Sequence, residues 1–202
     1  MTSILVFGGT FDPVHNGHLS IAGQARVATG ADAVWFVPAA LAPLRDTPRA
    51  TPEDRFDLLL AACAGTGLAV LDVAIRHGGI SYTADVMDAL RSEFPTDDLA
   101  ILIGADAARS IERWQRAGDL LRTEQFVIVN RTGPPPIDAD ELSRLGYPPS
   151  RTTLLTIDSP DISASDVRER CARGESVEGL VPDVVAALIA ARGMYRQNRD
   201  DA

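Results

Sequence analysis

Lysine is absent from this sequence of 202 residues, and every one of its 19 basic residues is arginine. The absence excludes a Schiff-base lysine, a lysine general base and the lysine of a phosphate-binding P-loop. Any cationic group that holds a phosphate must therefore be an arginine, a histidine or a metal ion, and backbone N–H groups are the only other donors of comparable use.

Cysteine and long apolar runs are also scarce. Cys63 and Cys171 are the only cysteines, and they are too far apart for the spacing of a metal site. Two such thiols are typical of a reducing compartment. No apolar run is long enough to cross a bilayer, and the first residues lack the basic segment of a signal peptide. We therefore expect a cytoplasmic protein with no membrane partner.

Charge and length narrow the class further. The formal net charge of −9 argues against a general nucleic-acid binder, which needs a basic surface to neutralise phosphates. It does not exclude a small phosphorylated substrate, for which a few arginines suffice. The length predicts one domain over residues 1–202 or one domain with an appendage. A homo-oligomer is possible.

The pattern of apolar segments predicts a doubly wound α/β fold, with a mostly parallel, Rossmann-like sheet and helices on both faces. Short apolar runs, each followed by a helical pattern or a loop, predict strands at 3–7, 33–37, 68–75, 99–103, 125–129 and 153–157. Helices are expected at 17–27, from Thr51-Pro52 onward, and at 83–94, 107–113, 118–123, 165–173 and 183–192. Residues 131–151 show little periodicity and are expected to form a loop.

Ligands of such sheets bind at the carboxyl ends of the strands. Four segments follow predicted strands there and are expected on one edge: Gly8–His18, Pro38–Arg49, Gly104–Asp106 and Arg131. This convergence is the first indication of a functional site.

The segment GGTFDPVHNGH, residues 8–18, holds two of the three histidines. Gly8 and Gly9 lack a Cβ and allow the backbone to approach a ligand closely. The spacing G-x-G-x-x-G of dinucleotide-binding folds is absent, and so is the P-loop pattern. What remains is H-x-G-H, with His15 and His18 expected at the start of a helix. Free N–H groups and the positive end of the helix dipole make that position an anion site.

Two other interpretations of the histidines are open. One ring could be in the core and the other on the surface by chance, with no shared role. The pair could also bind zinc, although no third ligand lies near the H-x-G-H segment in the sequence.

Four segments in this order resemble those of a known family. GGTFDPVHNGH resembles the H-x-G-H signature of the nucleotidyltransferase superfamily, and residues 161–182 resemble its second signature, I-S-[SA]-[ST]-x-x-R. Residues 79–90, GISYTADVMDAL, and 103–114, IGADAARSIERW, resemble the S-Y-T and G-x-D…W segments. Together they resemble the bacterial nicotinate mononucleotide adenylyltransferases over nearly the whole chain.

The resemblance implies an enzyme of NAD biosynthesis. It would join nicotinate mononucleotide and ATP into deamido-NAD and release pyrophosphate, by direct in-line attack of the mononucleotide phosphate on the α-phosphate. That phosphate is already an anionic nucleophile, so catalysis would be alignment and charge stabilisation. Mg²⁺ is implied by ATP, held mainly through the triphosphate and without a named protein ligand.

The resemblance also implies the site residues. His18 and His15 would be catalytic at the α-phosphate. ATP would bind Gly8, Gly9, Thr10, Phe11, Gly104, Asp106, Ser163, Ser165 and Arg168. The mononucleotide would bind Tyr82, Thr83, Trp114, Arg45 and Arg131. The helices from about residue 163 would close the nucleotide site.

One loop departs from the family. Where the family has P-P-H-K after the second strand, this chain has Ala42-Pro43-Leu44-Arg45. Arg45 keeps the cation, and Leu44 replaces the imidazole. The acceptor could therefore be another phosphomonoester, such as nicotinamide mononucleotide, phosphopantetheine or a polyol phosphate. A non-catalytic nucleotide sensor is the alternative from a different class.

Overall fold

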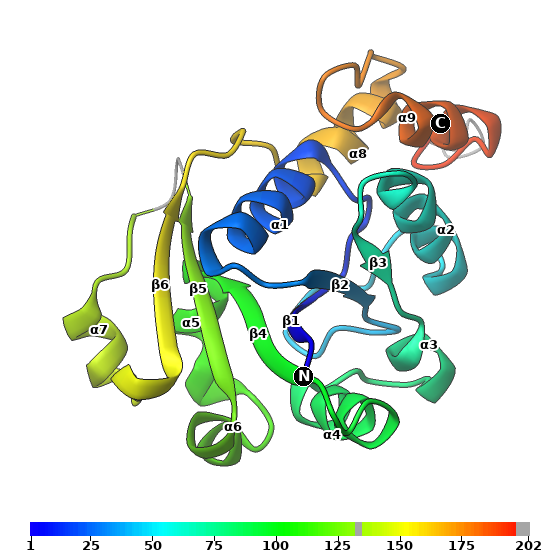
Figure 1. Ribbon diagram of the computed structural model, residues 1–202. Coiled ribbons are helices and arrows are strands. Elements are labelled where there is room, and N and C mark those ends of the chain that lie inside the picture. Colours follow the sequence, from blue (N-terminus) through cyan, green and yellow to red (C-terminus); the bar gives the residue numbers. More distant parts are fainter. Residues whose placement is uncertain (132–134, 197–202) are drawn as a thin grey trace.

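A computed structural model describes residues 1–131 and 135–196 and contains a six-stranded, fully parallel sheet (Figure 1). The strand order is β3-β2-β1-β4-β5-β6. The strands are β1 (Ser3–Gly9), β2 (Ala33–Pro38), β3 (Ala69–Val70), β4 (Asp98–Gly104), β5 (Gln125–Arg131) and β6 (Thr152–Ile157). The chain winds outward from β1 to β3 and returns to β4 beside β1, so the strand order reverses between β1 and β4. The predicted doubly wound fold is confirmed.

Helices cover both faces of the sheet, and alternate strand residues explain why. Leu5 and Phe7 of β1 belong to one core cluster, and Ile4 and Val6 belong to the other. The first cluster packs beneath α1 (Asn16–Thr29), α2 (Pro52–Cys63), α8 (Ala164–Arg173) and α9 (Asp183–Ala191). The second packs against α3 (Val73–His77), α4 (Thr83–Glu93), α5 (Ala105–Arg109), α6 (Ala117–Thr123) and α7 (Ala139–Arg144). Short 3-10 turns, η1 (Ile111–Arg113) and η2 (Pro149–Arg151), complete the described elements.

The start of α2 follows its sequence signals. Thr51 is the N-cap and its hydroxyl accepts a hydrogen bond from the Asp54 N–H at 3.1 Å, while Pro52 occupies the first helical position. Proline needs no partner there because it has no N–H. The predicted start of this helix is confirmed.

The predicted strand at 68–75 is wrong over most of its length. Only Ala69 and Val70 pair with β2, and Val73–His77 form helix α3 instead. Arg76 lies one turn after Asp72 and donates to its carboxylate at 2.8 Å, and Gly78 ends the helix. A short apolar run does not distinguish a strand from a buried helix by periodicity alone.

The predicted loop at 131–151 is also wrong in part, because it contains α7. Asp138 caps this helix by accepting a hydrogen bond from the Glu141 N–H at 2.7 Å, and Leu142 is buried against the second cluster. The stretch Asp138-Ala-Asp-Glu carries the N-cap and first-turn acids of a helix start. Within the described residues, no helix is long and apolar enough to cross a membrane.

Candidate active site

The carboxyl ends of four strands bring the predicted segments to one edge of the sheet. In the parallel register, Gly9 of β1 lies opposite Pro38 of β2, and Gly104 of β4 lies opposite Val129 of β5. The Gly8–His18 segment, the Pro38–Arg49 loop, Gly104–Asp106 and Arg131 therefore share this edge, as predicted. The start of α1 lies beside α8 and α9 at the same end of the molecule (Figure 1).

His15 and His18 form a stacked pair at the start of α1. His15 is the N-cap residue and His18 lies three residues later in the first turn. Their ring centroids are 3.6 Å apart, with an angle of 24° between the planes. The His15 backbone N–H donates to Nδ1 of His18 at 3.3 Å. Because Nδ1 of His18 accepts, a neutral His18 ring carries its proton on Nε2, where it can donate to a ligand.

Both imidazoles are electrically neutral at neutral pH. The pKa of His15 is lowered to about 4, chiefly by burial and also by the charge of Arg131, while the charge of Asp166 opposes the shift. Burial also lowers the pKa of His18 well below its usual value, helped by His15 and Arg131. The pair can therefore bind an anion by hydrogen-bond donation and through the helix end, and it makes a poor general base.

The glycine-rich turn brings the ring of Phe11 into contact with the ring of His18. A Cβ on Gly9 would lie 2.8 Å from Cζ of Phe11, so this glycine permits close packing within the chain. Phe11 has a left-handed φ of 50°, and its ring packs edge-on against His18 with a centroid distance of 5.0 Å. A Cβ on Gly8 would meet nothing within 4 Å. Gly8 and Thr10 remain predicted nucleotide contacts through their backbone groups.

Asp12 is a buried residue whose carboxylate links three segments of the chain, and the sequence did not point to it. Asp12 is 4% exposed, and it accepts hydrogen bonds from the Arg49 N–H at 2.8 Å and the Ala50 N–H at 3.1 Å. The hydroxyl of Tyr195 donates to the same carboxylate at 2.8 Å. This one side chain therefore links three parts of the chain: the Gly8–His18 segment (the histidine loop), the segment before α2 and the turn after α9.

Arg55 is a second missed residue and is fully buried. Its guanidinium donates to the carbonyl oxygens of Thr10 at 2.6 Å and Ala40 at 2.9 Å. Burial lowers the pKa of Arg55, and the charge of Asp12 opposes that shift. The side chain fastens the histidine loop to the loop after β2. A sequence signal existed, because Arg55 shares a helix stripe with the core residues Leu58, Leu59 and Ala62.

The second signature reaches the histidine loop through Arg168. Ser163 caps α8 by accepting from the Asp166 N–H at 3.1 Å. Arg168 donates to the Asp12 backbone carbonyl at 2.7 Å and to Oγ of Ser165 at 3.0 Å. Its Nε is buried and has no hydrogen-bond partner within the part of the chain that the structure describes. Ser165 and Arg168 of α8 and its N-cap Ser163 are thus tied to the histidine loop, and their contacts with ATP stay predictions.

Arg131 stands between β5 and the second signature. It donates to Oδ1 of Asp161 at 3.1 Å, and its charge acts on both histidines. On the other side of the pair, the backbone N–H and side-chain amide of Asn16 donate to the carbonyls of Leu180 and Gly179, each at 2.9 Å. The segment between α8 and α9 therefore borders the start of α1.

The remaining predicted residues lie on a more open part of the edge. Gly104 is the N-cap position of α5, and Asp106 is exposed in its first turn, 3.8 Å from Nη1 of Arg109. Arg45 is exposed, and no hydrogen bond or ion pair joins it to any other described residue. These positions are accessible to a ligand, and their roles stay predictions.

Tyr82, Thr83 and Trp114 come from neighbouring elements. Tyr82 holds the N-cap position of α4 and Thr83 is its first residue, so Thr83 is not a simple N-cap. Trp114 is partly buried and its indole N–H donates to Oγ of Ser110 at 3.1 Å. Arg116, two residues on, forms an ion pair with Asp88 of α4 at 2.6 Å. This bridge holds the tryptophan segment beside the S-Y-T segment.

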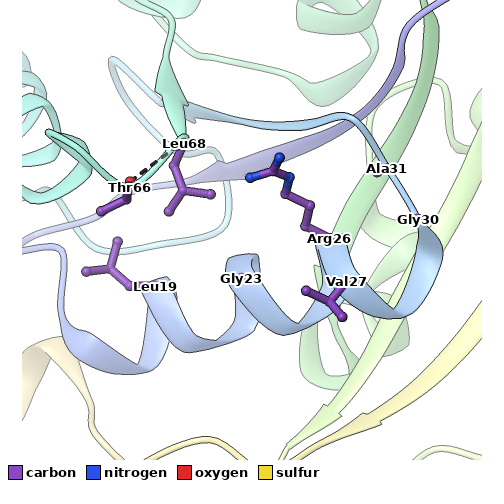
Figure 2. A pocket seen from close by; sticks show the side chains of 8 residues that line it. All are labelled: Leu19, Gly23, Arg26, Val27, Gly30, Ala31, Thr66 and Leu68. Atoms are coloured by element: carbon purple, nitrogen blue, oxygen red, sulfur yellow. Dashed lines mark hydrogen bonds between the residues drawn. The ribbon is translucent and has the colours of Figure 1, made fainter.

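A separate pocket lies between α1 and the segment that holds Thr66 and Leu68, and it contains none of the predicted site residues (Figure 2). Its lining comprises Leu19, Gly23, Arg26, Val27, Gly30, Ala31, Thr66 and Leu68. The zinc interpretation finds no support either, because the described residues form no group of three or more His, Cys, Asp or Glu able to hold a metal ion.

Comparisons with known proteins agree with this geometry. The family model of Cytidylyltransferase-like proteins matches residues 6–170. A relative named probable nicotinate-nucleotide adenylyltransferase from Roseiflexus is 36% identical over 195 residues, covering 95% of this chain and 96% of the relative. One of the same name from Dehalococcoides mccartyi is 34% identical over 197 residues, covering 95% and 96%.

A solved structure shares the fold. The nicotinic acid mononucleotide adenylyltransferase of Plasmodium falciparum, complexed with NaAD, superposes with a TM-score of 0.78 at 17% sequence identity, covering 96% of this chain and 98% of that one. The chain therefore belongs to the nicotinate-nucleotide adenylyltransferase family of Cytidylyltransferase-like enzymes.

Proposed function

We propose that this enzyme transfers the adenylyl group of ATP to nicotinate mononucleotide, giving deamido-NAD and pyrophosphate. The observation that carries the proposal is the neutral, stacked pair of His15 and His18 at the start of α1; the charge of Arg131 acts on both rings, and Arg168 donates to the Asp12 carbonyl of the same segment. A helix start with two imidazole donors and two guanidinium groups suits the charge of a triphosphate. The names of the relatives support the acceptor.

The chemistry needs no general base. A phosphate oxygen of the mononucleotide attacks the α-phosphorus of ATP, a new P–O bond forms, and the bond to the β-phosphate oxygen breaks. Pyrophosphate leaves with that electron pair, so negative charge grows on the α-phosphate oxygens and on the leaving group. Burial lowers the pKa of both histidines, to about 4 for His15, so both would be poor bases, which agrees with a role as hydrogen-bond donors.

Each donor has a proposed task. His18 donates from Nε2 to an α-phosphate oxygen, and His15 stacks beside it and shapes its position. Arg168, with Ser163 and Ser165, contacts the β- and γ-phosphates from α8. Arg131 meets the phosphate of the mononucleotide, which must lie next to the α-phosphate for in-line attack.

In this proposal the adenine base of ATP and the pyridinium ring of the mononucleotide occupy the open part of the sheet edge. Backbone groups of Gly8, Gly9, Thr10, Phe11 and Gly104 line the ATP, and Asp106 accepts hydrogen bonds from its ribose. Trp114 stacks on the pyridinium ring. N–H groups at Tyr82 and Thr83 receive the ring carboxylate, and Arg45 adds a cation near the phosphates.

Mg²⁺ enters as part of the substrate, bound to triphosphate oxygens. Mg²⁺ commonly keeps several waters and binds through phosphates rather than in an all-protein cage. The described residues contain no cluster of His, Cys, Asp and Glu suited to a cage, and the Asp12 carboxylate already accepts three hydrogen bonds. An ion carried by ATP fits this site.

The replacement of a histidine by Leu44, next to Arg45, favours one alternative: the same reaction on another phosphomonoester. A panel of acceptors separates the two, with nicotinate and nicotinamide mononucleotides, phosphopantetheine and a polyol phosphate each tested with ATP and with CTP. Release of pyrophosphate is measured. We expect ATP with nicotinate mononucleotide to be fastest. Faster reaction with phosphopantetheine or with CTP would overturn the proposal, and ATP binding without turnover on any acceptor would identify a sensor.

A further inference from the structure

Tyr195 follows α9 and has an unusual backbone conformation. Its φ of 61° is left-handed, which costs a residue with a side chain on the order of 1–2 kcal/mol. The residue is 8% exposed and belongs to the first core cluster, and Arg192, at the end of α9, pairs with Asp54 and Asp57 of α2 at 2.7 Å each. The surrounding contacts therefore fix this residue in a strained backbone position.

The hydroxyl of Tyr195 completes the environment of the Asp12 carboxylate. Oδ1 of Asp12 accepts from that hydroxyl and from the Ala50 N–H, and Oδ2 accepts from the Arg49 N–H. Burial, followed by the charge of Asp12, raises the pKa of Tyr195 above its usual range, so the hydroxyl keeps its proton and donates. Three neutral donors therefore stabilise this buried anion.

Arg168, the basic residue nearest to this carboxylate, is not one of its three hydrogen-bond donors. Nη1 of Arg168 lies 4.0 Å from Oδ2 of Asp12 and donates instead to the backbone carbonyl of Asp12 at 2.7 Å. A buried carboxylate and guanidinium this close attract each other strongly. Without the tyrosine hydroxyl, Oδ1 would keep only the Ala50 N–H as a donor, and the carboxylate would be free to turn toward Arg168, whose Nη1 lies 4.0 Å from Oδ2.

We infer that Tyr195 is a positioning residue, which holds Asp12 away from Arg168 and leaves the guanidinium available to the triphosphate. The inference rests on the proposed function in one respect, the contact of Arg168 with ATP phosphates. It gives the last turn of the described chain a role in the reaction although Tyr195 touches neither substrate.

The test compares Tyr195→Phe, Arg168→Gln and the double variant with the unmodified enzyme. Tyr195→Phe should lower kcat/KM for ATP by about tenfold and leave KM for the mononucleotide within about twofold, because only the triphosphate end changes. In the Arg168→Gln background, Tyr195→Phe should lower kcat/KM for ATP by less than about twofold, because the guanidinium that Tyr195 keeps available is already absent. An equal loss in both backgrounds would overturn the inference.

Tyr147→Phe is the matched control. Tyr147 is 2% exposed, and its hydroxyl donates to the Ala108 carbonyl at 3.2 Å in the other core cluster. Tyr147→Phe should lower Tm by about as much as Tyr195→Phe does and leave kcat/KM for ATP unchanged. If the two variants have equal losses of kcat/KM at equal losses of Tm, the role of Tyr195 is merely structural and the inference is wrong.

Equilibrium dialysis with ATP separates this inference from the proposed function. Tyr195→Phe should weaken ATP binding in the unmodified enzyme and hardly at all with Arg168→Gln. If no acceptor is adenylylated but this pattern holds, the proposed function fails and the inference stands. If adenylylation proceeds and ATP binding is unaffected by Tyr195→Phe in either background, with kcat/KM also unchanged, the inference fails alone.

Discussion

The two ends of the candidate site differ in how firmly the chain holds them. At the triphosphate end, His15, Asp12 and Arg55 are 6%, 4% and 0% exposed, and each buried carboxylate or guanidinium has several hydrogen-bond partners. At the proposed acceptor end, Arg45 is exposed, and Trp114 is only partly buried. Under the proposed function, the residues for the transfer chemistry are therefore preorganised, whereas those for the acceptor lie on a more exposed surface.

The largest effect is expected at the triphosphate end. His18→Ala should lower kcat by roughly 100-fold or more and change KM for ATP much less, because the lost Nε2 donor acts on charge that develops in the transition state. Steady-state kinetics with ATP and the mononucleotide measure this. His77→Ala, at the end of α3, is the control and should behave as the unmodified enzyme. Weaker ATP binding with an unchanged kcat would remove His18 from the chemistry.

Preorganisation itself is tested through Arg55. Arg55→Met keeps an apolar stem and leaves the Thr10 and Ala40 carbonyls without their donor, which should lower the free energy of unfolding by about 2 kcal/mol. Urea denaturation gives that value. Arg192→Met removes two exposed ion pairs, with Asp54 and Asp57, and should lower the free energy of unfolding much less than Arg55→Met does. Equal losses in the two variants would contradict the contrast between buried and exposed arginines.

The acceptor end should respond selectively. Trp114→Ala should raise KM for the pyridine mononucleotide by about tenfold and spare KM for ATP, since stacking on the ring is lost. Trp35→Phe is the control, because Trp35 packs on Phe94 at a centroid distance of 4.6 Å away from the predicted contacts. If Trp114→Ala raises both KM values equally, Trp114 is a structural residue and the two ends are not independent.

A smaller effect concerns pH. The pKa of His15 is lowered from 6.5 to about 4 in the folded chain, so the unfolded chain binds the proton more readily. Stability is therefore fully present above about pH 6.5 and declines as pH falls toward 4, with a loss of roughly 1 kcal/mol between pH 7.5 and 5.5. Urea denaturation at these two pH values measures it. His15→Gln should make the dependence shallower and leave the part that His18, whose pKa is also lowered, contributes; an unchanged slope would show that His15 does not titrate in this range.

The sequence was informative where a signal is local. The H-x-G-H segment, the carboxyl ends of the strands and the Thr51-Pro52 helix start each depend on neighbouring residues, and the structure has them where they were predicted. The predicted strand at 68–75 was wrong because β3 is an edge strand that, among the described strands, pairs only with β2. The apolar residues that follow it form helix α3, which also buries apolar side chains.

The missed site residues depend on distant parts of the chain. Asp12 meets Tyr195 across 183 positions, and no short motif records such a contact. Arg55 was detectable in principle as a charged residue in an apolar helix stripe, although its carbonyl partners were not. Long-range pairing of buried polar groups is specified by the whole fold, which explains why it escapes inspection of single segments.

The most direct test of the account is ¹⁵N NMR of the histidine rings, with His77→Gln to leave only His15 and His18. At pH 7 we expect both rings to be neutral, with His18 protonated at Nε2 and its Nε2 signal shifting when a non-hydrolysable ATP analogue binds. A charged imidazolium, a proton on Nδ1 of His18 or no response to the nucleotide would contradict the claim that a neutral histidine donor acts on the transferred phosphate.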